Sequence, residues 1–475
     1  MIVPRDWKRV TPYACRIRNW TSEDLSYIEE PVVDHLAFGR LPDYILPRLT
    51  HMEVTATSVS GVHLQTFLLC PSLESVTVWN TDQSLWAGRA MNTFFRTLAD
   101  RAPNLKKLIV HWGDSIIPSL PFIEGLSDVF TNPRFDLHTV NLWSPLCVAP
   151  KSFYLLSQLP NLTTLHLNLI GMSDASSLCS QIKNKSEAFP SLQNVFLAGM
   201  VDEFQKVLRY FSDQQMISLG FSVREYPKAK SLTQLFHVVA ASFTTLRVLQ
   251  FNVPKEEIDS EMANRHYDAN PDAYYCGRSV LQPLLAIRSL SAVHIELGVP
   301  LCLSNADLRV IGTSWPKIEV LDLCSDPYCE QTRLVQPVAD FEGLRELVFH
   351  CARLKHLGLY IDYSSFLSEE TIADMNMASN SLIHLDVGRS WLIEPPLVAA
   401  ALSGAFPNLK VFQWCGMEGQ EDDMLFSPES VDRIAFNNVR QWRQVYDLLP
   451  IFKATRANER RRQLIEGTEV QMIVD

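Results

Sequence analysis

The sequence predicts an α/β solenoid, in which strands and helices alternate along the chain and stack unit upon unit. Three observations lead to this prediction. A phrase with apolar residues at the positions L-x-x-L-x-L recurs about thirteen times. Leu290 and Ile318, which open consecutive copies, lie 28 residues apart, as do Leu354 and Leu382. The 475 residues are 47% hydrophobic and 20% charged, which is ordinary globular composition.

The recurring phrase is clearest where a proline precedes it. These copies begin at Pro71, Pro103, Pro160, Pro190, Pro316 and Pro407. Less regular copies begin at Leu49, Leu137, Met216, Leu246, Leu290, Leu354 and Leu382, and Val431 opens a further candidate copy. The second half of the phrase alternates as a β-strand does, with every second side chain turned inward. One unit cannot bury its apolar face alone, so the copies predict a leucine-rich-repeat horseshoe, with parallel strands on the concave face and helices on the convex face.

The segments between the phrases predict the helices. Residues 91–99 and 396–402 have helical character, and both stretches stop shortly before a Pro-x-Leu, where a helix is expected to end. We assign residues 47–440 to the repeats. The long interval after Leu246 contains a polar, acidic stretch rich in turn residues, which predicts an inserted loop at about 254–279.

The two ends of the chain differ from the repeats. Residues 1–46 are interpreted as an N-terminal helical cap or linker. Residues 441–475 are interpreted as a C-terminal helical cap with a basic tail, because solenoids need a capped end. Apolar residues at helical spacing support this cap: Trp442, Val445, Tyr446 and Leu449.

Composition and motifs argue against several classes of function. The net charge of −11 and a pI of about 5.6 leave no broad basic face, so no nucleic-acid partner is expected. Neither a signal peptide nor an apolar run of about 18 residues is apparent, which predicts no membrane segment and an intracellular protein, cytoplasmic or nuclear. Phosphate-loop, nucleophile-elbow and zinc-protease motifs are missing, so we expect no cofactor and no enzyme. A catalytic site built on the inserted loop stays a third alternative.

The ten cysteines are interpreted as reduced thiols, and no metal site is expected. The nearest approach to a zinc-ligand set is Cys324 and Cys329 with His350 and Cys351. Zinc ligands usually come in tighter pairs, so structural thiols are the better interpretation.

The concave face is the expected binding surface for a protein target. Counting the first leucine of each phrase as zero, positions two, four and six face the cavity, and aromatic side chains on a rigid surface are typical binding hot spots. The candidate partner-binding residues are Trp79, His111, Trp143, His166, Phe196, His294, His356, Tyr360 and His384. The competing interpretation is that these candidates are ordinary solvent-facing strand residues, present because of their high β-propensity. A pH-sensitive surface is the less favoured interpretation of the histidines, which strands tolerate as half-polar residues.

The N-terminal segment resembles a known pattern. From Asp6 to Arg18 it reads DWKRVTPYACRIR. This is similar to the D-W-x-R-F-x-x-Y-A-x-R-[VI]-R segment that follows the F-box in many mushroom-forming (basidiomycete) fungi, with Val10 in place of the usual aromatic residue. Together with the Pro-Asn-Leu leads, the chain resembles the repeat region of fungal F-box/leucine-rich-repeat proteins.

The resemblance implies a role in ubiquitination. In that family the F-box docks on the Skp1 subunit of a cullin ubiquitin ligase, and the repeats hold the protein to be modified. No F-box is recognisable in this sequence. The segment from Leu41 to Leu46 imitates an F-box opening, but Pro47 would interrupt the helix. The expected function is therefore substrate recognition for a ligase, and the alternative is a stand-alone scaffold or inhibitor.

Overall fold

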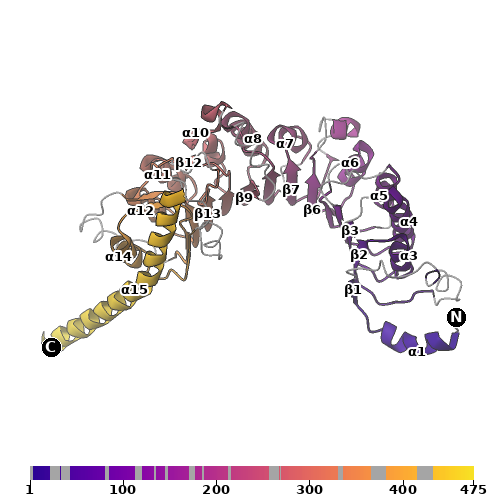
Figure 1. Ribbon diagram of the computed structural model, residues 1–475, viewed down its shortest axis with the longest axis horizontal. Coiled ribbons are helices and arrows are strands. Elements are labelled where there is room, and N and C mark those ends of the chain that lie inside the picture. Colours follow the sequence, from indigo (N-terminus) through magenta and orange to yellow (C-terminus); the bar gives the residue numbers. More distant parts are fainter. Residues whose placement is uncertain are drawn as a thin grey trace. The chain divides into compact units, whose positions relative to one another are not determined.

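A computed structural model of the chain describes residues 4–21, 31, 33, 43–80, 85–112, 120–132, 135–144, 148–170, 177–183, 187–211, 216–255, 267, 269–329, 335–364, 381–414 and 432–474. The chain forms two compact units, Met1–Ser222 and Val223–Asp475. In each unit the strands lie side by side and the helices lie along one side of them (Figure 1). The fold is α/β, a leucine-rich-repeat solenoid as the sequence predicts.

The strands of the first unit follow one another in sequence order, and β1 to β7 pair in parallel. They are β1 (Asn19–Thr21), β2 (His51–Ala56), β3 (Ser75–Asn80), β4 (Lys107–Trp112), β5 (Thr139–Leu142), β6 (Thr164–Asn168), β7 (Asn194–Gly199) and β8 (Ser218–Val223). The helices are α1 (Pro4–Ala14), α3 (Val59–Phe67), α4 (Leu85–Arg101), α5 (Leu120–Thr131), α6 (Pro150–Ser157), the short η1 (Ser177–Gln181) and α7 (Val201–Leu208). Strand β1 has no copy of the phrase, so it was not predicted.

The second unit continues the same alternation. Its main strands, again parallel, are β9 (Val248–Asn252), β11 (Ala292–Ile295), β13 (Val320–Leu323), β14 (His356–Leu359), β16 (His384–Asp386) and β18 (Val411–Gln413). Two short pairs accompany them: β10 (Cys276–Gly277) with β12 (Leu301–Cys302), and β15 (Asp362–Tyr363) with β17 (Trp391–Leu392). The helices are α8 (Ala229–Ser242), η4 (Pro271–Tyr274), α10 (Arg278–Leu281), η5 (Leu284–Ala286), α11 (Asn305–Ser314), α12 (Phe341–His350), α14 (Pro395–Ala405) and α15 (Asp432–Val474).

One expected repeat is wrong. The phrase that begins at Val431 is not a strand, because its residues from Asp432 onward form the start of α15. The apolar residues that decide this segment recur at helical rather than strand spacing: Trp442, Val445 and Leu449 are all buried. In contrast, the helices expected at 91–99 and 396–402 are confirmed as parts of α4 and α14.

A repeated set of hydrogen bonds explains both the strand register and the leading residues of the phrase. In each repeat one carbonyl oxygen, such as that of Glu74, accepts two N–H groups from the next repeat, here those of Lys106 and Lys107. The residue after the leading proline links the turns as well. Asn104 Nδ2 donates to the carbonyl of Pro71 at 2.8 Å, and the asparagine of another Pro-Asn-Leu copy, Asn161, donates to Asp136 Oδ1 at 2.7 Å.

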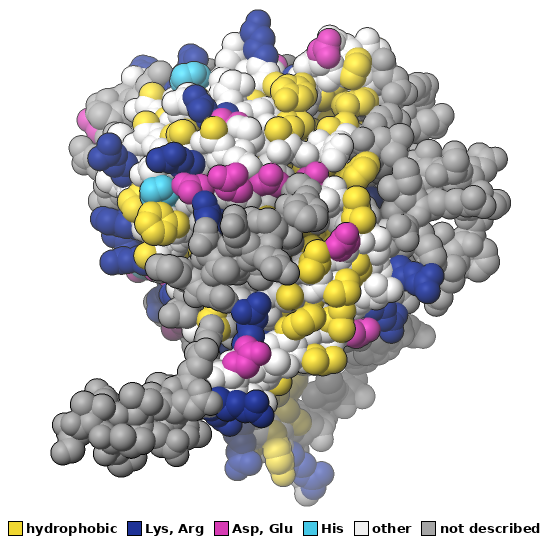
Figure 2. Space-filling view, turned by 90° about the vertical axis from the view of Figure 1, so that its left-hand side faces the viewer, with side chains coloured by type: hydrophobic (Ala, Val, Ile, Leu, Met, Phe, Trp, Pro, Cys, Tyr) yellow, Lys and Arg dark blue, Asp and Glu magenta, His cyan; other side chains and the backbone are white. Residues whose placement is uncertain are grey.

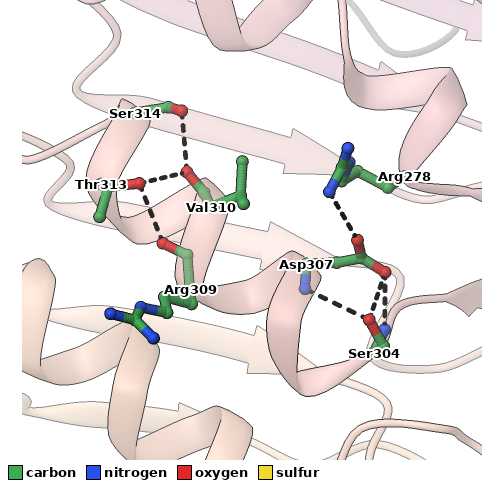
Figure 3. Close-up of polar contacts among 7 residues, drawn as sticks. All are labelled: Arg278, Ser304, Asp307, Arg309, Val310, Thr313 and Ser314. Carbon is green, nitrogen blue, oxygen red and sulfur yellow. Dashed lines mark hydrogen bonds and ion pairs between the residues drawn. The ribbon is translucent and has the colours of Figure 1, made fainter.

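Helix α11 shows how the sequence starts an individual helix. Ser304 and Asp307 form a reciprocal capping box, in which each side chain accepts from the other residue's backbone N–H (Figure 3). Arg278 donates to Asp307 at 3.3 Å. At the other end, Thr313 and Ser314 donate to carbonyl oxygens one turn earlier. The capping-box bonds satisfy N–H groups that the start of a helix leaves without intrahelical partners, whereas the Thr313 and Ser314 hydroxyls bond carbonyls within the helix.

Candidate protein-binding site

Five ring-bearing side chains line up on the solvent-facing side of the first unit, away from its helices. They are Trp79, His111, Trp143, His166 and Phe196, and we call them the ring strip. Parallel pairing places them on neighbouring strands, because Trp79 is opposite His111 and His166 is opposite Phe196. Trp143 follows β5 directly. Adjacent strands lie about 4.8 Å apart, so rings at matching positions are brought into contact.

The rings of the strip touch in sequence. The Trp79 and His111 rings stack with their centroids 3.9 Å apart and 6° between their planes. The Trp143 ring meets His166 edge to face at 5.9 Å and Phe196 at 5.2 Å. Trp79 is the most exposed of the aromatic members, at 38% of its surface. The strip is therefore a continuous, preformed surface of π faces rather than a set of separate side chains.

A glycine supports one end of the strip. The ring of Phe196 lies over Gly220 of β8, where an added Cβ would come within 2.4 Å of the ring. Any larger residue at position four of β8 would push the ring away. The sequence signal for this arrangement is a glycine at position four of its phrase, next to the repeat that has an aromatic residue at the same position.

The electrostatics of the strip keep its histidines neutral at pH 7. Burial lowers the pKa of His166, and the nearby Lys107 lowers it further. Burial also lowers the pKa of His111, against the opposing effect of Glu53. The Glu53 carboxylate accepts a hydrogen bond from the indole N–H of Trp79. A neutral imidazole has one nitrogen that accepts a hydrogen bond, so the strip offers acceptors as well as rings.

The candidate residues of the second unit do not form such a strip. His294 Nδ1 lies 3.1 Å from Asp322 Oδ2, and this contact raises the pKa of His294. The rings of His356 and His384 lie 5.2 Å apart, as the sequence predicts for neighbouring parallel strands. His384 Nε2 also lies 2.7 Å from Gln413 Oε1.

Tyr360 does not face solvent as its position in the phrase predicts. It is only 6% exposed, and its hydroxyl donates to the carbonyl of Val335. Cys324, at the same position of the preceding repeat, is also buried, with its thiol directed at the carbonyl of Val299. The loops that follow the strands of this unit fold over position six, which the repeat pattern alone does not reveal.

Those loops bring acidic side chains together at the carboxyl ends of the strands. Ser325 donates to Asp386 at 3.0 Å, and Arg389 donates to Asp326 at 2.6 Å. Burial raises the pKa of Glu296 to about 9, and the charges of Asp322, Asp326 and Asp386 add to this shift. Burial likewise raises the pKa of Asp386. Glu296 therefore carries a proton at neutral pH.

This acidic group gives the second unit a predictable pH dependence. The pKa of Glu296 is higher in the folded chain than in the unfolded one. Its contribution to the free energy of unfolding is therefore complete below about pH 4.5 and is lost as pH rises toward 9. His294 and Asp386 act in the same direction. The free energy of unfolding of the wild-type chain should fall as pH rises. We expect Glu296→Gln to make this fall shallower by up to about 1.4 kcal/mol per pH unit, because glutamine has no proton to lose. Urea unfolding at pH 5, 7 and 9 measures this slope.

The control is Glu394→Gln, which changes an exposed carboxylate of the same unit and should leave the slope unaltered. Equal slopes for wild type and Glu296→Gln would show that Glu296 is not held protonated.

The side of the molecule that carries the C-terminal elements has a different character. Figure 2 shows a row of acidic side chains there with Lys and Arg side chains close by. Charges of both signs also meet on α12, where Glu346 lies within 3.9 Å of Arg309, Arg345 and His350. Mixed charges of this kind are typical of a solvated surface. This side is therefore a weaker binding candidate than the ring strip.

Two further searches concern the described residues alone. None of their helices is both long and apolar enough to span a bilayer. Among the same residues, no three or more His, Cys, Asp or Glu side chains gather in a way that could hold a metal ion. Cys324, Cys329 and Cys351 form no disulfide and are buried, and the thiol of Cys351 points at backbone carbonyls.

Comparisons with known proteins give one structural likeness. No family model matches the chain, and no curated protein does. Among solved structures, it is similar to a chain in the crystal structure of the Rad7 and Elc1 complex in yeast, with 14% sequence identity and a TM-score of 0.40. The match covers 86% of this chain and 88% of that one. The fold assignment rests on the strand pairing described above.

Proposed function

We propose that this chain is a protein-recognition module that binds its target through the ring strip. The observation that carries the proposal is the unbroken series of ring contacts from Trp79 to Phe196 on a rigid parallel sheet. Rigid aromatic side chains lose little conformational entropy on binding, and they dominate the energetics of many interfaces.

The finer proposal is substrate recognition for a cullin ubiquitin ligase. It is supported by the resemblance of the segment from Asp6 to Arg18 to the region that follows an F-box. Part of that segment lies in α1, where Val10 and Tyr13 are 46% and 69% exposed. The apolar surface of this helix is thus available to a partner such as Skp1.

The test compares ring-strip variants with a variant on the helical side. We expect the double variant Trp79→Ala/Trp143→Ala to bind the proteins retained from lysate at least about tenfold more weakly. Truncating a hot-spot residue costs about 2 kcal/mol or more of binding free energy. Phe349→Ala, at a residue of α12 that is 76% exposed, is the matched control and should bind as wild type does.

Mass spectrometry of the retained proteins separates the two versions of the proposal. Skp1 and a cullin, retained by wild type and by the ring-strip variant alike, support the ligase role. Ring-dependent proteins without Skp1 indicate a stand-alone scaffold or inhibitor. Equal retention of all proteins by wild type and the double variant would overturn binding through the ring strip.

A further inference from the structure

Two buried polar atoms at the ring strip have no hydrogen-bond partner among the described residues. Asn141, at position four of β5, is 9% exposed, and its register partner on β6 is His166. Neither Asn141 Oδ1 nor His166 Nδ1 has a hydrogen-bond partner in the described part of the chain. A buried polar atom without a partner costs about 1–3 kcal/mol, so such atoms in a native surface call for an explanation.

The chemistry around these atoms indicates what would satisfy them. An asparagine Oδ1 accepts hydrogen bonds, and so does Nδ1 of a neutral imidazole that carries its proton on Nε2. The pKa of His166 is lowered, which keeps its ring neutral and free of repulsion toward a cation. The rings of Trp143 and Phe196 lie beside His166, with centroids 5.9 Å and 5.5 Å from its own. Lys107 is the cation close enough to affect His166, and it is exposed to solvent.

Among protein side chains, arginine matches this combination best. Its guanidinium is planar, carries five N–H donors, has no acceptor and stacks on aromatic rings. A lysine ammonium offers a compact point charge that is more strongly hydrated. An ionised carboxylate has only acceptor oxygens, so it cannot donate a hydrogen bond to Asn141 Oδ1 or His166 Nδ1.

We propose that the ring strip recognises an arginine side chain of its target protein, which stacks on the indole of Trp143 and donates hydrogen bonds to Asn141 and His166. The inference rests on the proposed function, since it names the chemistry of the partner at the same surface. Both acceptor atoms are shielded in the unbound chain, and Trp143 contacts His166 edge to face. The indole therefore turns aside as the arginine enters.

The experiment selects peptides from a random display library on the full chain. We expect the selected peptides to share one arginine. Replacing that arginine by citrulline, a neutral isostere, or by lysine should weaken binding about tenfold or more, because hydrogen bonds to charged groups are lost. This comparison uses the wild-type chain, so it does not depend on the folding of a variant. Unchanged affinity of the citrulline and lysine peptides would overturn the inference.

A variant of the chain adds an independent arm. Asn141→Leu preserves the shape of the side chain but removes its acceptor. This variant should bind the arginine peptide only as weakly as the wild-type chain binds the citrulline peptide. If Trp79→Ala/Trp143→Ala abolishes peptide binding while Asn141→Leu does not affect it, the ring strip binds proteins but not through this arginine site. If the selected peptides bind the double variant as tightly as wild type, the proposed function fails as well.

Discussion

Replacing Trp442 by alanine is expected to destabilise the second unit by about 4 kcal/mol, in the range for large-to-small changes at buried aromatic residues. Trp442 is 1% exposed, and its ring contacts Tyr363 and Phe412. Its indole N–H donates to the carbonyl of Ser390 at 2.8 Å. One side chain thus holds α15 against the loop after β16, and its loss leaves both a cavity and an unsatisfied carbonyl. Urea unfolding followed by circular dichroism measures the change.

Two further variants test this explanation. Trp442→Phe fills much of the cavity but cannot donate to Ser390, so we expect an intermediate loss of about 1–2 kcal/mol. Ile451→Ala, on the same helix but 61% exposed, should change stability by less than about 0.5 kcal/mol. A loss for Trp442→Ala no larger than that for Ile451→Ala would show that the indole does not anchor α15.

The second large effect is expected at Gly388. Its φ of +47° is a conformation that residues with a Cβ rarely adopt, and an added Cβ would lie 1.9 Å from the carbonyl oxygen of Ser325. Gly388→Ala must therefore displace backbone in both loops, at a cost of about 3 kcal/mol or more. The hydrogen bond from Ser325 to Asp386 should weaken with it.

The matched control is Gly277→Ala in the same unit. There an added Cβ makes only ordinary contacts, the nearest at 3.6 Å, and φ is not positive. We expect little change in the unfolding midpoint for this variant. If the two variants lost equal stability, the close approach of the two loops would not be what makes Gly388 necessary.

The sequence predicted the strands well because their information is local. Within β3, Val76 and Val78 are fully buried while Ser75, Thr77 and Trp79 are not, as the L-x-x-L-x-L phrase requires. The same periodicity also placed Trp79 and His111 on one surface. Register then follows from the repeated main-chain hydrogen bonds, so the contact between His356 and His384 could be anticipated from spacing alone.

The remaining features depend on contacts between distant residues. Tyr360 is buried, and its hydroxyl donates a hydrogen bond to the carbonyl of Val335, 25 residues earlier, a contact that no local pattern encodes. The protonated state of Glu296 likewise depends on its burial and on three later aspartates, Asp322 in β13, Asp326 after that strand and Asp386 in β16. The phrase at Val431 predicts a strand where the structure has a helix, because a short apolar alternation is compatible with both. The partner-binding role of the candidate residues stays a prediction.

The constant register of the strands has a consequence for how the protein can diverge. Leu246 and Leu290 are 44 residues apart, whereas Leu290 and Ile318 are 28 apart, yet β11 pairs position for position with both β9 and β13. Added sequence on the return path does not disturb the ladder, since doubling a loop costs only about 0.6 kcal/mol. Insertions and deletions between strands therefore change the free energy of unfolding little. A single-residue insertion within a strand would turn the following side chains to the opposite face of the sheet. Related chains can therefore differ widely in length while exposing the same row of side chains on the sheet.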